Sequence, residues 1–156
     1  MTGLRVLLCA ALCAGAPLAG AADFTWSGPS GGAALLPAEQ AFAMQPVTWA
    51  NGRLRLDWNV APGYYLYRDR IKVDIPGDPP GAGRLELPPA QPHKDEFFGE
   101  THIYRGHLAV RYVPPAGQFP RTVEVTVQGC ADRGVCYPPL TRTVAVQQTS
   151  SIPAGR

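Results

Sequence analysis

The stretch RLRLDWNV (Arg53–Val60) alternates polar and apolar side chains along its whole length. Its even-numbered positions carry Leu, Leu, Trp and Val, and its odd-numbered positions carry Arg, Arg, Asp and Asn. Successive side chains of a β-strand point to opposite faces, so this period of two predicts a strand with one face in a core and the other in solvent. An amphipathic helix would instead place apolar residues three and four positions apart.

The same alternation recurs along the chain, in IKVDI (71–75), HLAVRYV (107–113), TVEVTV (122–127) and TRTVAV (141–146). Stretches rich in Gly and Pro, such as PGDPPGAG (76–83), separate these segments and are typical of turns. Only PAEQAFAM (37–44) could form a short helix, and it could equally be a loop or an edge strand. Short strands at this spacing predict an all-β fold, an immunoglobulin-like antiparallel β-sandwich.

The first 22 residues have the layout of a secretory signal peptide. Arg5 precedes an uncharged apolar run, and small residues precede Asp23. We therefore expect residues 1–22 to be cleaved, with Cys9 and Cys13 lost with them. Residues 23–148 are expected to form one domain, and residues 149–156 a flexible tail.

Charge and secretion narrow the possible partners and chemistry. The formal net charge of the chain is +2, without a block of like charge. A nucleic-acid-binding domain would present a basic face, so no nucleic-acid partner is expected. After cleavage the remaining cysteines are Cys130 and Cys136, and in an oxidising compartment they are expected to be bonded to each other.

The stretch GCADRGVCYPP (129–139) places these two cysteines on either side of a predicted hairpin turn. Gly134 can supply the positive φ that such a turn needs, and facing residues of neighbouring strands are close enough for a disulfide. Three readings remain open at this point. The bond could be a structural cross-link, worth about 2.4 kcal/mol for so short a loop, or a redox couple. A zinc site that also uses His93, His102 or His107 is the third, although the five residues between the cysteines exceed the usual two to four.

Two other stretches carry aromatic side chains outside the alternating pattern. PHKDEFFGE (92–100) contains Phe97 and Phe98 among charged residues, where they either plug the core or cover something. GYYLYRDR (63–70) places Tyr65 and Tyr67 on one strand face, and their hydroxyl groups need hydrogen-bond partners if they are buried.

Taken together, PGYYLYRDRI (62–71), KDEFFGETHIYRGHL (94–108) and GCADRGVCYPP resemble the amino-terminal periplasmic domain of the DsbD family, membrane proteins that carry reducing equivalents to the bacterial periplasm. The resemblance runs from about residue 35 to residue 146. It implies an immunoglobulin-like domain with a redox-active cysteine pair flanking a hairpin at one end, in which Cys136 forms mixed disulfides with partners and Cys130 resolves them. It also implies a cap loop and residues lining the active site: Asp95, Glu96, Phe97, Phe98 and Gly99 in the loop, and Tyr65, Tyr67 and Tyr137 in the lining.

The resemblance also implies the partners and the location. In the family, a thioredoxin-like domain fed by a transmembrane domain reduces the pair, which then reduces disulfide isomerases and thioredoxin-fold proteins of cytochrome c maturation. We therefore expect a monomeric protein-disulfide reductase in the periplasm of a Gram-negative bacterium, without cofactor or metal. It would work either as a stand-alone relay or as part of a longer membrane protein. The alternative is a non-catalytic immunoglobulin-like binding module with a structural disulfide.

Overall fold

The computed structural model describes residues 34–115 and 117–149. The expected signal peptide and residues 23–33 lie outside this part, as do residues 150–156 of the expected tail. Thr149, the first residue of that tail, is bonded to the sheet: its amide and its hydroxyl both donate to the Trp49 carbonyl, at 3.2 and 2.8 Å.

The described residues form two hydrogen-bonded sheets. The larger one has the order β5, β10, β13, β2, β3, β9, β6, with β1 paired to β3. Its strands are β1 (Phe42–Met44), β2 (Val47–Ala50), β3 (Arg53–Val60), β5 (Lys72–Asp74), β6 (Arg84–Glu86), β9 (His107–Val113), β10 (Thr122–Val127) and β13 (Leu140–Gln148). The smaller sheet has the order β12, β11, β4, β8, β7. Its strands are β4 (Tyr64–Tyr67), β7 (Gln91–Asp95), β8 (Gly99–Tyr104), β11 (Gly129–Ala131) and β12 (Val135–Cys136).

The larger sheet encloses one main core. The apolar side chains that alternate with polar ones along its strands pack there. In β3 the buried positions are those that the alternation predicts, and the same holds for β9 and β10. The largest fully buried side chains of this core include Trp58, Leu56, Val110 and Tyr112. The predicted all-β immunoglobulin-like sandwich is confirmed.

Two details of the larger sheet go beyond the sequence prediction. PAEQAFAM divides into a four-residue helix, α1 (Ala38–Ala41), followed by β1. The second detail departs from the expected antiparallel pairing, because β13 and β2 pair in parallel, with Val146 opposite Val47. No helix in the described part of the chain has the length and hydropathy to cross a membrane.

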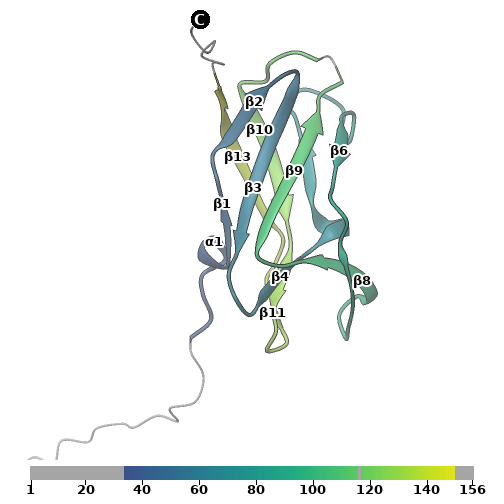
Figure 1. Cartoon of the computed structure of the whole chain (residues 1–156). Coiled ribbons are helices and arrows are strands. Elements are labelled where there is room, and N and C mark those ends of the chain that lie inside the picture. Colours follow the sequence, from purple (N-terminus) through teal and green to yellow (C-terminus); the bar gives the residue numbers. More distant parts are fainter. Residues whose placement is uncertain (1–33, 116, 150–156) are drawn as a thin grey trace, which may run out of the picture. The chain divides into compact units, whose positions relative to one another are not determined.

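The smaller sheet gathers the predicted site elements at one end of the sandwich. Figure 1 shows β4, β11 and β8 at the end of the domain away from β2. A 3-10 turn, η1 (Arg68–Arg70), continues from β4. The hairpin of β11 and β12 carries both cysteines, and the hairpin of β7 and β8 carries the expected cap loop.

Replacing Leu56 by Ala should lower the free energy of unfolding by about 3 kcal/mol, because Leu56 is fully buried and the loss of its side chain leaves a cavity in the main core. Denaturant titration with the disulfide intact measures the change. As a control, Val135→Ala on the exposed strand β12 should change the free energy by less than about 1 kcal/mol. Equal losses in the two variants would contradict this placement of the core.

Candidate functional site

Cys130 and Cys136 form a disulfide across the β11–β12 hairpin. They are direct cross-strand partners with Cα atoms 4.0 Å apart. Gly134 in the connecting turn has a φ of +75°, which is the conformation expected of it from the sequence. The hairpin therefore presents the sulfur–sulfur bond next to a short turn.

The two cysteines occupy different places in the smaller sheet. β11 lies between β12 and β4, so that Cys130 faces Cys136 on one side and Tyr65 on the other. Cys130 is completely buried, whereas Cys136 is partly exposed. β12 has two residues and stands at the edge of the sheet. A partner approaching from solvent meets Cys136 first.

Two tyrosines of β4 lie beneath the sulfur atoms. Tyr65 and Tyr67 form a small buried cluster with Ile103 and Cys130, separate from the main core. The Tyr67 hydroxyl oxygen lies 3.1 Å from Cys130 Sγ and 3.8 Å from Cys136 Sγ. The two tyrosine rings meet edge to face, with centroids 5.3 Å apart.

The Asp95 carboxylate connects this tyrosine pair to the cap loop. Its Oδ2 accepts a hydrogen bond of 2.5 Å from the Tyr67 hydroxyl and a longer one of 3.5 Å from Tyr65. Its Oδ1 accepts from the backbone amides of Phe97 and Phe98, at 2.9 and 2.8 Å. One side chain therefore shapes the loop and holds it over the site.

Burial and hydrogen bonding set the protonation states of these groups. Burial, followed by the hydrogen bond to Asp95, raises the pKa of Tyr67 far above its usual value. Burial also raises the pKa of Tyr65. Burial of Asp95 acts in the same upward direction, but the hydrogen bonds from Tyr67, Phe98 and Phe97 outweigh it and lower the pKa of this carboxyl. The site at neutral pH thus holds a protonated Tyr67 and an ionised Asp95.

This arrangement would influence the sulfur atoms after reduction. Because Tyr67 donates its proton to Asp95, its oxygen remains free to accept a hydrogen bond from the Cys130 thiol. The nearby carboxylate also disfavours a second negative charge. Both effects favour the neutral thiol of Cys130, and a thiol is a far weaker nucleophile than a thiolate.

The two phenylalanines of the cap loop have different surroundings. The Phe98 ring packs edge to face on Tyr67, with centroids 4.7 Å apart, and the Arg70 guanidinium lies over the Phe98 ring, 4.5 Å from its centre. Phe97 is 45% exposed and Phe98 37% exposed. Gly99, where the loop enters β8, has a φ of +67°, a conformation that favours glycine at a hinge position.

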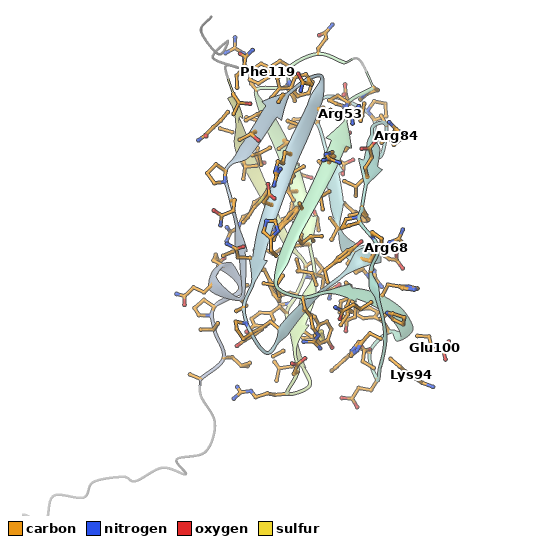
Figure 2. All side chains as sticks on the ribbon, viewed as in Figure 1. Arg53, Arg68, Arg84, Lys94, Glu100 and Phe119 are labelled. Atoms are coloured by element: carbon orange, nitrogen blue, oxygen red, sulfur yellow. A yellow bond between two sulfur atoms is a disulfide. The ribbon has the colours of Figure 1, made fainter. Side chains whose placement is uncertain are left out.

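The turn of the cap loop also lies next to the turn of the cysteine hairpin. A Cβ atom built on Gly134 would lie 3.9 Å from Glu96 Oε1. Figure 2 shows Lys94 and Glu100, on the flanking strands β7 and β8, at the end of the domain opposite Phe119. The expected cap-loop residues are therefore together at the disulfide end.

Tyr137 is the one expected lining residue that the structure places in another cluster. Its ring packs edge to face on Phe42, with centroids 5.4 Å apart, and lies 6.2 Å from Tyr64 in the main core. Its hydroxyl donates to the Leu36 carbonyl at 2.6 Å. The alternation of side chains turns it away from its neighbour Cys136.

Three residues that sequence reasoning did not assign to the site also contact it. The His93 ring lies 4.7 Å from the Tyr65 ring, and its Nε2 lies 3.6 Å from Asp95 Oδ2. Its position two residues before Asp95 on a strand is the signal that could have placed it on the same face. Arg70 and Arg105 contact Phe98 and Tyr65, and no local pattern marks either of them.

The histidines considered as zinc ligands are not gathered into a metal site. Within residues 34–115 and 117–149, no three His, Cys, Asp or Glu side chains are grouped so that they could hold an ion. His107 instead lies beside Asp57, with Nε2 3.2 Å from Oδ1.

Comparison with known proteins gives one consistent family. Residues 32–148 match the family described as the N-terminal part of the thiol:disulfide interchange protein DsbD. The chain is 45% identical over 114 residues to DsbD of Pectobacterium atrosepticum, and 40% identical over 122 residues to DsbD 2 of Pseudomonas aeruginosa. These matches cover 73% and 78% of this chain, but only 19% and 20% of those proteins. The chain thus spans about a fifth of the length of the curated relatives it matches.

Solved structures support the same relationship. The N-terminal domain of Neisseria meningitidis DsbD in the reduced form is 30% identical, with a TM-score of 0.62 over 72% of this chain and 90% of that one. The complex between the DsbD and PilB N-terminal domains from the same organism gives a match with 27% identity and a TM-score of 0.60, over 71% of this chain and 86% of that one.

Replacing Asp95 by Ala should lower the free energy of unfolding by about 2 kcal/mol at neutral pH, because Tyr67 and two loop amides lose a charged acceptor. The pKa of Asp95 is lower in the folded protein than in the unfolded chain. Its contribution is therefore complete above the unfolded pKa of about 3.9 and is lost as the pH falls through the folded value.

Denaturant titrations at several pH values measure the difference between native protein and the Asp95 variant. The difference should be constant from pH 7 to about pH 5 and should shrink below about pH 4. The exposed Asp69, which pairs only locally with Arg68, serves as the control in Asp69→Ala and should have little effect. A difference of the same size at pH 3 and pH 7 would show that the charge of Asp95 is not what holds the loop.

Proposed function

Because this chain belongs to the family of DsbD N-terminal domains, we propose that it is a periplasmic thiol–disulfide exchange domain in which the Cys130–Cys136 pair passes electrons to thioredoxin-fold proteins. The observation that carries the proposal is the placement of this disulfide. It links β11 to the two-residue edge strand β12. The Tyr67 hydroxyl lies beside both sulfur atoms, and the cap loop, held by the Asp95 carboxylate, lies next to them. A disulfide whose only role was to stabilise the fold would stabilise it more by joining segments that are far apart in the sequence.

The reaction proceeds in two exchange steps. The Cys136 thiolate attacks one sulfur of the partner's disulfide, which forms a mixed disulfide and releases one partner thiolate. Cys130, once deprotonated, then attacks Cys136 Sγ and releases the second partner thiolate. The partner gains two electrons, and the domain is left with the Cys130–Cys136 disulfide. A thioredoxin-like donor dithiol restores the two thiols by the same steps in reverse.

The different exposure of the two cysteines supports this division of roles. The attacking sulfur must reach a sulfur atom of another protein, which the partly exposed Cys136 can do. The buried Cys130 is accessible mainly to its hairpin neighbour, as suits a resolving thiol. Tyr67 and Asp95 would keep Cys130 as a neutral thiol until Cys136 has formed the mixed disulfide, whose Cys136 sulfur Cys130 then attacks.

The cap loop (95–99) would act as a shield that opens when a partner docks. Its backbone is held by two hydrogen bonds to Asp95 and its Phe98 ring by Tyr67 and Arg70. These few contacts can break without disturbing the core. Partly exposed aromatic rings in such a loop can also pack on a docking partner.

Location and donor are proposed on the same basis. The expected signal peptide and the DsbD family together support a position in the periplasm of a Gram-negative bacterium. The relatives are about five times as long as the matched segment. We therefore propose that a membrane electron-transfer protein and a thioredoxin-like domain supply electrons, within the same polypeptide or as separate proteins. The acceptors would include disulfide isomerases and proteins of cytochrome c maturation.

Trapping tests the proposal directly. The Cys130→Ser variant retains Cys136 and should accumulate a mixed disulfide with a purified periplasmic thioredoxin-fold protein supplied in its oxidised form, visible by non-reducing electrophoresis. The Cys136→Ser variant, which retains the buried Cys130, should give at least tenfold less adduct, because Cys130 is inaccessible. If a folded Cys130→Ser variant forms no adduct with disulfide isomerases or cytochrome c maturation proteins, the exchange role is wrong.

Replacing Phe98 by Ala should increase the rate at which dithiothreitol reduces the disulfide about fivefold, since loss of its ring contact with Tyr67, worth about 1 kcal/mol, makes the loop open more readily. Alkylation of the freed thiols at timed intervals measures the rate. Phe119→Ala is the matched control, because Phe119 is similarly exposed, at 39%, and lies at the opposite end of the domain (Figure 2). An unchanged rate for the Phe98 variant would remove this ring from the shield.

A further inference from the structure

Arg105 and Asp132 form an ion pair that connects the end of β8 to the turn of the cysteine hairpin. The two terminal nitrogens of the guanidinium group, Nη2 and Nη1, donate to the two carboxylate oxygens of Asp132, at 2.7 and 3.1 Å. This bidentate geometry is the most directional form of an arginine–carboxylate pair. Asp132 is the second residue after Cys130 in the chain, so the pair acts close to the sulfur atoms.

Arg105 is itself held by the strand that forms the floor of the site. One guanidinium nitrogen also donates to the Tyr64 carbonyl at 3.3 Å, and the group lies 5.0 Å from the centre of the Tyr65 ring. Gly106, which follows it, has a φ of +65° in the tight connection to β9. Arg105 therefore fixes the hairpin turn relative to β4, the strand that carries Tyr65.

The hairpin needs such an anchor when the disulfide is open. β12 contains Val135 and Cys136 and pairs only with β11. In the described residues, backbone hydrogen bonds to the turn itself come from the amides of Asp132 and Gly134, to Gly63 and Ala131. Reduction removes the covalent link between the strands. The position of Cys136 then depends on two neighbours: Tyr137, whose amide donates to the Gly129 carbonyl at 3.0 Å, and the turn that precedes the cysteine.

We propose that Arg105 is a positioning residue that sets the reduction potential of the Cys130–Cys136 pair by holding the hairpin turn through Asp132. The proposal rests on the proposed function, in that the pair must cycle between disulfide and dithiol. With glutathione, two protein thiols and one glutathione disulfide give the protein disulfide and two glutathione thiols. The equilibrium constant for this exchange rises with the fraction of time that the two protein thiols are close enough to bond.

Loss of the ion pair should therefore disfavour the disulfide. Without Arg105, the reduced hairpin gains conformational freedom that must be lost again when the bond forms. Both side chains are partly exposed, at 35% and 47%, so solvent weakens the pair. We expect the equilibrium constant to fall about fivefold, which corresponds to a reduction potential about 20 mV less negative.

The experiment equilibrates the secreted protein with glutathione buffers of different ratios without oxygen, and alkylation followed by mass spectrometry gives the oxidised fraction. The variants are Arg105→Ala, Asp132→Ala and the double variant. Each single variant should lower the constant about fivefold, and the double variant no further than either single one, because both remove the same interaction. The double variant also restores the net charge, which separates positioning from a charge effect on the thiolates.

Arg84→Ala is the matched control, since Arg84 pairs with Glu86 at 2.8 Å in the larger sheet, away from the site (Figure 2). It should leave the constant unchanged. A purely structural role for Arg105 would lower the free energy of unfolding of the oxidised and reduced forms equally and leave the exchange constant unaltered. Arg105→Lys keeps the charge but not the bidentate geometry, and should lower the equilibrium constant only about twofold. This variant replaces Arg105→Ala in the test if the alanine variant does not fold.

The outcomes separate the two proposals. If the native disulfide equilibrates with glutathione or dithiothreitol and the Arg105 and double variants have the native constant, the positioning role is overturned while the exchange function stands. If the constant falls in Arg105→Ala but returns to the native value in the double variant, the effect is one of charge and the positioning role is again overturned. If the native disulfide is not reduced by either thiol, the proposed function itself fails.

Discussion

The site depends on one partly buried charge, the Asp95 carboxylate, and on the donors that satisfy it. A carboxylate that is partly removed from water needs hydrogen bonds or an opposite charge, because losing them destabilises the charged form. Asp95 obtains its donors from two segments: the tyrosine hydroxyls of β4 and the backbone amides of the cap loop. The same requirement therefore orients Tyr67 toward the sulfur atoms and bends the loop beside them.

The two cysteines differ in accessibility because they lie on different strands of the smaller sheet. Cys130 lies on an interior strand above Tyr65 and Tyr67, and Cys136 lies on the edge strand. Edge strands are weakly held and accessible, and interior strands are paired on both sides. The main core contributes little to this chemistry, because the tyrosines that face the sulfur atoms belong to a separate cluster. The larger sheet can therefore remain rigid while the hairpins at its end move.

The alternation of polar and apolar residues predicted much of the fold, because such alternation indicates a strand with one buried face. β3, β9 and β10 each bury one face in this way. The parallel pairing of β13 with β2 escaped prediction, since it joins segments about a hundred residues apart and leaves no local trace. At the site, the cysteine hairpin and the tyrosine face could be anticipated from spacing. The ion pair of Arg105 with Asp132 could not, because it depends on how two connections between strands meet in space.

The cap-loop phenylalanines and the turn of the cysteine hairpin would act on different quantities, the rate of exchange and its equilibrium. The cap loop contacts Tyr67 and Arg70 but is not part of the cysteine hairpin. Loosening it changes how often a partner reaches the sulfur atoms without changing how well the two thiols are aligned. The turn held by Arg105 acts on that alignment, which belongs to the free energy difference between dithiol and disulfide. In the proposed exchange with several partners, this separation would let the docking loop vary while the hairpin turn keeps the driving force constant.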